Sequence, residues 1–165
     1  MKTLRRRRKE NKTDYNIRIK LLKGGVPRVV FRKTNRYVLA EYVISEGAKD
    51  KVLMEITSKI LLKYGWPEDR TGSLKSIPAS YLTGFLFGKR ITEKKRETPV
   101  LDIGMIRNVR KSRIFSFIKG LIDAGVKIQC KEEFFPGEGR IKGKDLKHDF
   151  SFVFEKVKSK IEKNE

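Results

Sequence analysis

The sequence predicts an α/β fold: a single mixed, mainly antiparallel sheet packed with helices, with a basic N-terminal arm and a C-terminal amphipathic helix. Three observations carry this prediction. Three alternating apolar and polar stretches follow one another with short turns between them, as in an antiparallel meander. A short apolar stretch follows a long helical pattern, and such a helix is the natural crossover to a parallel strand. The chain then ends in a segment whose apolar residues recur at helical spacing.

The N-terminal segment differs from the rest of the chain. Residues 1–12 have almost no apolar content, so they are expected to be disordered alone and ordered only on a partner. Thr13 or Asp14 is placed to cap a short helix that runs to about Lys23, where Gly24-Gly25 ends it.

Alternating patterns predict three successive strands. The first spans Arg28 to Lys33, and the turn Thr34-Asn35-Arg36 joins it to a second strand from Tyr37 to Ile44. A third strand spans Val52 to Thr57, after a turn that begins at Glu46-Gly47. The predicted core faces of these strands are Val29 and Phe31, then Val38, Ala40, Tyr42 and Ile44, then Val52, Met54 and Ile56.

Helical patterns fill most of the remaining chain. Ser58 is placed to cap a short helix that ends near Tyr64-Gly65. Ser76 caps a stronger helix that runs to about Ile91, with Pro78 in its first turn, where a missing N–H costs nothing. Gly84 and Gly88 lie four residues apart in this helix and would let its backbone approach a sheet closely.

The C-terminal half adds one strand and two helices. Val100 to Ile103 is a brief buried strand, expected to lie parallel to a neighbour. Ser112 caps a helix that runs to Ala124, and a final amphipathic helix begins at about Lys147. These patterns divide the chain into a basic arm (1–12), an α/β domain (13–146) and a helical extension (147–165).

Charge identifies the class of partner. The sequence carries a net charge of +20, from 40 lysines and arginines against 20 acids. Residues 1–36 hold 14 of these cations against only Glu10 and Asp14. Such a balance favours a polyanion, and for a basic domain of this size that is most often a nucleic acid. The single cysteine excludes an intrachain disulfide, and the absence of a long apolar run predicts no membrane span and no secretory signal.

Residues that could support catalysis are few and scattered. His148 has no partner at metal-ligand spacing, and Cys130 has no histidine nearby in sequence. Asp102 ends a strand and might pair with Glu132 and Glu133, but a magnesium-dependent nuclease needs several converging acids. We therefore expect no catalytic residue, no metal site and no cofactor.

Basic residues interleaved with Tyr, Thr and Asn form three groups instead. They lie in the arm and the helix behind it, on the first hairpin, and around the start of the helix that Ser112 caps. A helix start also favours anions, because its backbone N–H groups are unpaired. The predicted RNA-binding residues are Arg5, Arg6, Arg7, Arg8, Lys9, Lys12, Thr13, Tyr15, Arg18, Lys20, Arg28, Arg32, Thr34, Asn35, Arg36, Arg107, Arg110, Lys111, Ser112, Arg113 and Lys119.

Several ordered motifs resemble the universal large-subunit ribosomal protein eighteen family in its archaeal and eukaryotic form, whose eukaryotic members are traditionally called protein five. The motifs are Arg5-Arg6-Arg7-Arg8 followed by Lys12-Thr13-Asp14-Tyr15; Arg28-x-x-x-Arg32-x-Thr34-Asn35-Arg36; Pro78-Ala79-x-Tyr81-Leu82-Thr83-Gly84; Leu101-Asp102-Ile103-Gly104; Ser112-Arg113-Ile114-Phe115; Lys119-Gly120-x-x-Asp123-Ala124-Gly125; Phe135-Pro136; and Arg140-Ile141-x-Gly143. Each is short, but together they run in order from residue 5 to about 143.

The resemblance implies a structural, non-enzymatic protein of the cytoplasmic ribosome. It would bind 5S rRNA in the central protuberance and join it to the large-subunit rRNA and to neighbouring large-subunit ribosomal proteins. Two positions depart from the family pattern: Lys111 stands where a glycine is usual, and Gln129-Cys130 replaces a Pro-His pair. The rival interpretations are an RNA-processing enzyme, which would need an acid or histidine cluster, and a membrane-surface protein that uses the tail helix.

Overall fold

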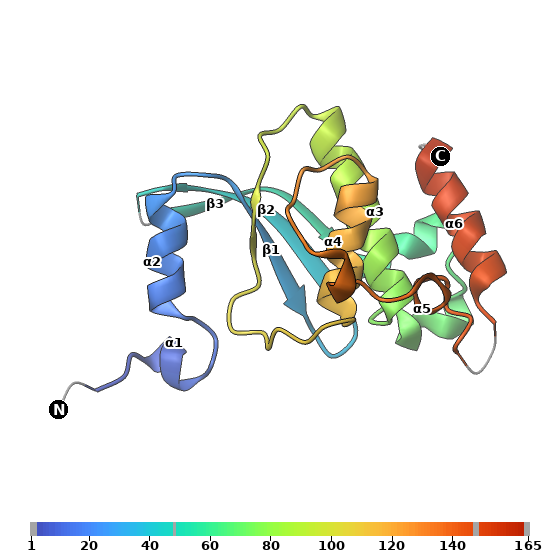
Figure 1. Ribbon diagram of the computed structural model, residues 1–165, viewed down its shortest axis with the longest axis horizontal. Coiled ribbons are helices and arrows are strands. Elements are labelled where there is room, and N and C mark those ends of the chain that lie inside the picture. The colour runs from blue at the N-terminus through green and yellow to red at the C-terminus, as the bar shows by residue number, and fades with distance from the viewer. Residues whose placement is uncertain (1–2, 48, 147–148, 164–165) are drawn as a thin grey trace.

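A four-stranded sheet with the strand order β3-β2-β1-β4 organises the chain. The computed structural model describes residues 3–47, 49–146 and 149–163. In chain order the elements are α1 (Arg6–Lys9), α2 (Tyr15–Lys23), β1 (Arg28–Lys33), β2 (Val38–Glu46), β3 (Lys49–Thr57), the 3-10 helices η1 (Ser58–Tyr64) and η2 (Glu68–Ser73), α3 (Ile77–Glu93), β4 (Val100–Asp102), α4 (Arg113–Asp123), η3 (Glu132–Phe134), α5 (Glu138–Lys142) and α6 (Ser151–Lys163). The predicted α/β class is confirmed (Figure 1).

The sheet has the predicted mixed topology. Strands β1 and β2 form an antiparallel pair in which Phe31 faces Ala40, and β3 extends the meander on the far side of β2. Strand β4 pairs with β1 in parallel, with Val29 opposite Leu101. The crossover through α3 explains this direction, because a parallel strand can be reached only after the chain has returned to the same end of the sheet.

Two details of the β2–β3 ribbon differ from the prediction. Val52 was expected in the core, but it is 49% exposed, and a register irregularity between Tyr42 and Val43 turns Val43 inward. A β-bulge of this kind shifts the alternation of side chains beyond it. Ser58 does not cap η1 with its side chain, because its buried hydroxyl accepts a hydrogen bond from the backbone N–H of Val38.

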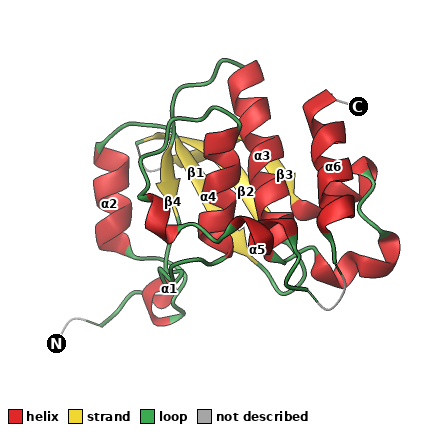
Figure 2. Cartoon of the chain, turned by 45° about the vertical axis from the view of Figure 1, so that its right-hand side comes forward, coloured by secondary structure: helices red, strands yellow, loops and turns green. Residues whose placement is uncertain are grey.

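Helices α3 and α4 pack against each other on one face of the sheet (Figure 2). The sequence indicated that Gly84 and Gly88 allow close approach to a sheet, but they face α4. A Cβ on Gly84 would overlap the backbone carbonyl oxygen of Phe117, and one on Gly88 would lie 2.7 Å from the Cβ of Ala124. The glycines therefore set the helix–helix distance, while the ring of Phe117 packs 5.0 Å from that of Phe31 on the sheet.

The predicted side-chain caps form in two of four cases. Asp14 accepts hydrogen bonds from the N–H groups of Asn16 and Ile17, and Ser76 accepts one from Ala79. Ser112 stands at the N-cap of α4, but its side chain makes no capping hydrogen bond. The segment after α4 contains the short helix α5, which the sequence analysis did not predict.

The two ends of the chain lie at opposite ends of the molecule (Figure 1). Residues of the predicted arm form one helical turn, α1, and α2 buries none of its residues. Helix α6 buries Phe154, Val157 and Ile161, and Lys89 of α3 donates hydrogen bonds to the carbonyls at its C-terminal end. The apolar face of the tail helix is therefore packed on the protein itself. Residues 147 and 148, where this helix was expected to begin, lie outside the described residues.

Candidate nucleic-acid interface

A buried ion network lies under the interface. The guanidinium of Arg28 donates to Asp102 at 2.7 Å, to Asp50 at 2.9 Å and to Ser45 at 2.9 Å, and the side chain is only 2% exposed. The network joins strands β1, β2, β3 and β4. Arg28 was predicted to contact RNA, but its side chain is buried beneath the surface. A lone buried charge is costly, and two carboxylates hold this one inside the fold.

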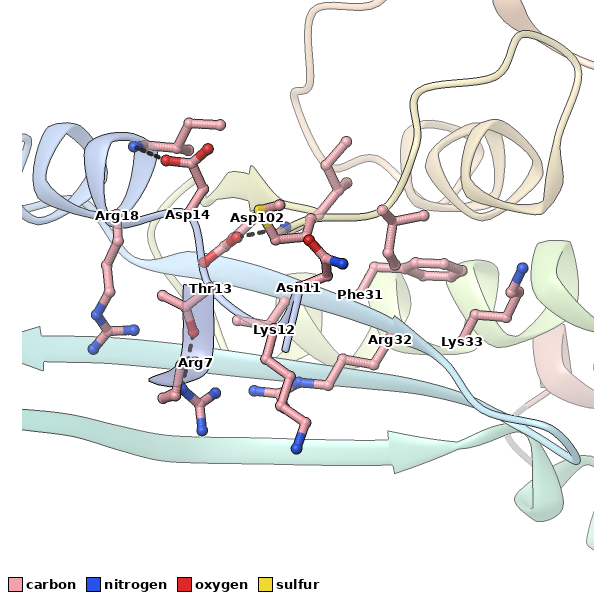
Figure 3. A pocket seen from close by; sticks show the side chains of 16 residues that line it. Arg7, Asn11, Lys12, Thr13, Asp14, Arg18, Phe31, Arg32, Lys33 and Asp102 are labelled. Carbon is pink, nitrogen blue, oxygen red and sulfur yellow. Dashed lines mark hydrogen bonds between the residues drawn. The ribbon is translucent and has the colours of Figure 1, made fainter. Parts of the chain in front are cut away.

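The arm and strand β1 enclose a groove of about 310 Å³. Arg7 and Lys12 line it from the arm, Thr13 lines it just after the arm, and Arg32 and Lys33 line it from β1 (Figure 3). The structure thus brings together two of the basic groups, which are separated by about 20 residues in the sequence. Lys33 was missed because it ends the strand pattern, although its neighbour Arg32 was identified.

Most cations of the arm and of this groove already have partners. Arg8 binds Asp14 at 2.7 Å and touches the sulfur of Met105, Lys12 binds Glu10 at 2.8 Å, and Arg18 of α2 binds Asp50 at 2.8 Å. Arg7 donates to the hydroxyl of Thr13. The remaining predicted residues of this region are held more loosely: Arg6 pairs with Glu10 at 3.6 Å, Arg32 pairs with Glu41 at 3.5 Å, Arg5 lies over the ring of Tyr15, and Lys9 and Lys20 are exposed.

The acids of these pairs hold their protons weakly. The pKa of Asp14 is lowered by the N–H groups of Ile17 and Asn16 and by Arg8, which together outweigh the effect of burial. Burial alone would raise the pKa of Asp50, but hydrogen bonds from Arg18 and Ser45 and the charge of Arg28 lower it. Both carboxylates are therefore charged at neutral pH: Asp50 holds α2 against the sheet through Arg18, and Asp14 holds the arm to the start of α2 through Arg8.

The hairpin tip presents polar groups to solvent. The hydroxyl of Thr34 exchanges hydrogen bonds with the backbone of Tyr37, which fixes the turn. Asn35 and Arg36 are exposed at this tip and have no side-chain partner among the described residues. They are free to meet a ligand at the end of the sheet.

The third basic group surrounds a second cavity, of about 590 Å³, that shares Phe31, Lys33 and Ile106 with the groove. Arg107, Arg110, Lys111, Ser112 and Arg113 line it as a group. The fold adds Lys33 from β1 and Arg140 from α5, which the sequence did not connect with them. Lys111 has a φ of +56°, the left-handed conformation that favours glycine and agrees with the glycine usual at this position in the family.

Lys119 lies apart from both cavities. Its ammonium group pairs with Asp123 at 3.2 Å and lies over the ring of Phe135. The structure therefore does not bring it together with the other predicted residues.

The residues weighed for catalysis are placed as follows. Cys130 is partly buried, and burial raises the pKa of its thiol, which disfavours the reactive thiolate. Asp102 binds Arg28, and Glu133 lies 3.9 Å from Arg110, so these acids do not converge. Within residues 3–47, 49–146 and 149–163, no three His, Cys, Asp or Glu side chains are arranged to hold a metal ion. His148 lies outside this part of the chain.

Comparison with known proteins relates this chain to ribosomal proteins. A family model described as ribosomal large subunit proteins 60S L5 and 50S L18 matches residues 1–100. The large ribosomal subunit protein uL18 of Korarchaeum cryptofilum is 41% identical over 86% of this chain and 70% of its own length. That of Methanothrix thermoacetophila is 38% identical over 94% of this chain and 92% of its own. No helix among the described residues is long and apolar enough to cross a bilayer. The chain therefore belongs to the family of large-subunit ribosomal proteins that comprises 60S L5 and 50S L18.

Proposed function

We propose that this protein binds 5S rRNA and helps to attach it to the large-subunit rRNA in the central protuberance. Proteins of this family are structural components of the large ribosomal subunit and not enzymes. The observation that carries the proposal is the continuous basic surface formed by the arm groove and the second cavity, which meet at Lys33. A surface of this kind suits the closely spaced phosphates of a folded RNA.

The groove and the arm contribute differently to RNA binding. Cations already held by carboxylates, such as Arg8 and Arg18, lose little conformational entropy when RNA binds. Because their positions are fixed, they favour one orientation of the ligand. The exposed cations Arg6 and Lys9 attract phosphates but do not fix the orientation of the RNA. Asn35 and Tyr15 offer hydrogen bonding and stacking to bases or sugars. We propose residues 1–12 as an arm that follows the RNA and residues 13–146 as the domain that orients it.

The tail helix does not favour the rival membrane interpretation. A helix that binds a bilayer surface must turn its apolar face to the lipid. In α6 the apolar residues Phe154, Val157 and Ile161 are buried against the protein, although Phe152 is exposed.

Competition binding tests the proposal. The full-length protein is bound to labelled 5S rRNA at about 0.15 M salt and challenged with unlabelled 5S rRNA or with an unrelated structured RNA of equal length. We expect 5S rRNA to compete at least about a thousandfold better, the lower end of the range for specific binding. Equal competition by both RNAs would show general polyanion binding and would overturn the proposal.

A further inference from the structure

The second cavity differs from the arm groove in its charge balance. Six cationic side chains line it, from β1, from the loop before α4, from the start of α4 and from α5: Lys33, Arg107, Arg110, Lys111, Arg113 and Arg140. No acid lines it. Two acids, Asp14 and Asp102, line the arm groove.

The cations of this cavity are also largely unpaired. Among the described residues only Arg110 has a carboxylate partner, Glu133 at the long distance of 3.9 Å, and both of those side chains are more than half exposed. Neither Arg113 nor Arg140 has a side-chain hydrogen bond or an ion pair in that part of the chain. Like charges gathered without counter-charges repel one another and oppose folding, so a bound anion would relieve the repulsion.

One hydroxyl beside the cavity lacks a hydrogen-bond partner among the described residues. Ser112 lines the cavity at the N-cap of α4, and its Oγ is the one buried side-chain polar atom among the described residues that has no hydrogen-bond partner. Buried hydroxyls are normally satisfied, so one that remains unsatisfied indicates a missing ligand atom. A phosphate oxygen is an acceptor for this hydroxyl and for the guanidinium of Arg113 beside it.

The charge of the cavity exceeds that of a single small anion. A phosphate monoester carries at most about two negative charges, whereas six cations face this cavity. Successive backbone phosphates of a nucleic acid carry one charge each and match a cavity walled by several separate elements. The match in charge therefore favours a segment of RNA backbone over a free metabolite.

We propose that this cavity is a phosphate-binding site for RNA backbone and that its cations contribute to the salt-dependent affinity of the protein. The inference rests on the proposed function, because it assumes an RNA ligand. Ser112 and Arg113 hold one phosphate, while Arg140 and Lys33 hold its neighbours from the opposite walls. The arm groove, in which Lys12, Arg18 and Arg32 are already paired with carboxylates, contributes orientation.

Paired substitutions test this assignment. Arg113→Gln/Arg140→Gln removes two cavity cations without breaking an ion pair within the described residues, and Lys59→Gln/Lys63→Gln removes two exposed cations from η1 that line neither cavity. Affinity for 5S rRNA is measured from about 50 to 200 mM salt. The cavity variant should lower the slope of log affinity against log salt by about 1.8, because each neutralised phosphate contributes about 0.9. The η1 variant should leave the slope unchanged.

A second substitution isolates the hydroxyl. Ser112→Ala removes one oxygen from the wall, so it should weaken RNA binding several-fold while the melting temperature stays the same. An unchanged slope in the cavity variant, or equal slope losses in the cavity and η1 variants, would overturn the inference. Unchanged binding by Ser112→Ala would remove the hydroxyl from the site.

The same titrations on an unrelated RNA of equal length separate the two proposals. Loss of slope on both RNAs without preference for 5S rRNA would refute the proposed function and support the phosphate site. Preference for 5S rRNA with an unchanged slope would refute only the phosphate site.

Discussion

Replacing Arg28 should lower the free energy of unfolding without removing an RNA contact. Arg28→Met keeps most of the side-chain volume but leaves Asp102 without its cationic partner and removes one from Asp50. Removing one member of a buried pair typically costs about 3–5 kcal/mol. Asp102 and Asp50 are 15% and 31% exposed, and Asp50 keeps Arg18, so we expect a loss at the lower end, about 3 kcal/mol.

Thermal and urea unfolding measure this loss. For a chain of this size, about 3 kcal/mol lowers the melting temperature by roughly 6–12 °C. With a slope of about 2 kcal/mol/M, the urea midpoint falls by about 1.5 M. Arg28→Lys should recover only part of the loss, because one ammonium group cannot reproduce a planar fork that reaches two carboxylates and a hydroxyl.

The matched control lies four residues along the same strand. Arg32 is 59% exposed and pairs with Glu41 at 3.5 Å, so Arg32→Met should change the free energy of unfolding by less than about 0.5 kcal/mol and weaken RNA binding. If Arg28→Met instead kept full stability and lost RNA affinity, the buried network would not be a structural support and our reasoning would fail.

Four further outcomes are expected. Gly84→Ala should destabilise by at least about 3 kcal/mol in urea unfolding, because its Cβ overlaps backbone, whereas Gly72→Ala, with open space around it, should be nearly neutral. Lys111→Gly should stabilise by about 1 kcal/mol by relieving the left-handed strain, and it should weaken RNA binding. The folded-state pKa of Asp14 is below its unfolded value of about 3.9. The contribution of Asp14 to the free energy of unfolding is therefore complete above that pH and is lost as the pH falls through the folded-state pKa. Asp14→Asn should make the decrease in stability with falling pH less steep in this acidic range. Deleting residues 1–12 should leave the melting temperature nearly unchanged, because the arm buries no residue of α1, yet make the salt dependence of RNA binding shallower by several units; a collapsed fold with an unchanged salt slope would mean that the arm is packed structure.

The sequence by itself determined the elements and their class. Alternation identified the meander, because a half-buried sheet imposes a period of two on its residues. The position of Val100 to Ile103 after a helix identified the parallel strand, since chain geometry allows few other connections. Asp14 and Ser76 marked helix starts, because capping depends on residues only two or three positions away.

Only the tertiary structure decided which charges belong to the interface. Arg28 and Arg32 look alike in the sequence, yet one is buried between two carboxylates and the other faces solvent. Arg140 and Lys33 join the third basic group only because α5 and β1 meet beside α4. Gly84 likewise packs against a helix and not against a sheet. Local patterns fix the conformation of a segment, whereas the fate of a charge depends on the residues that distant parts of the chain bring next to it.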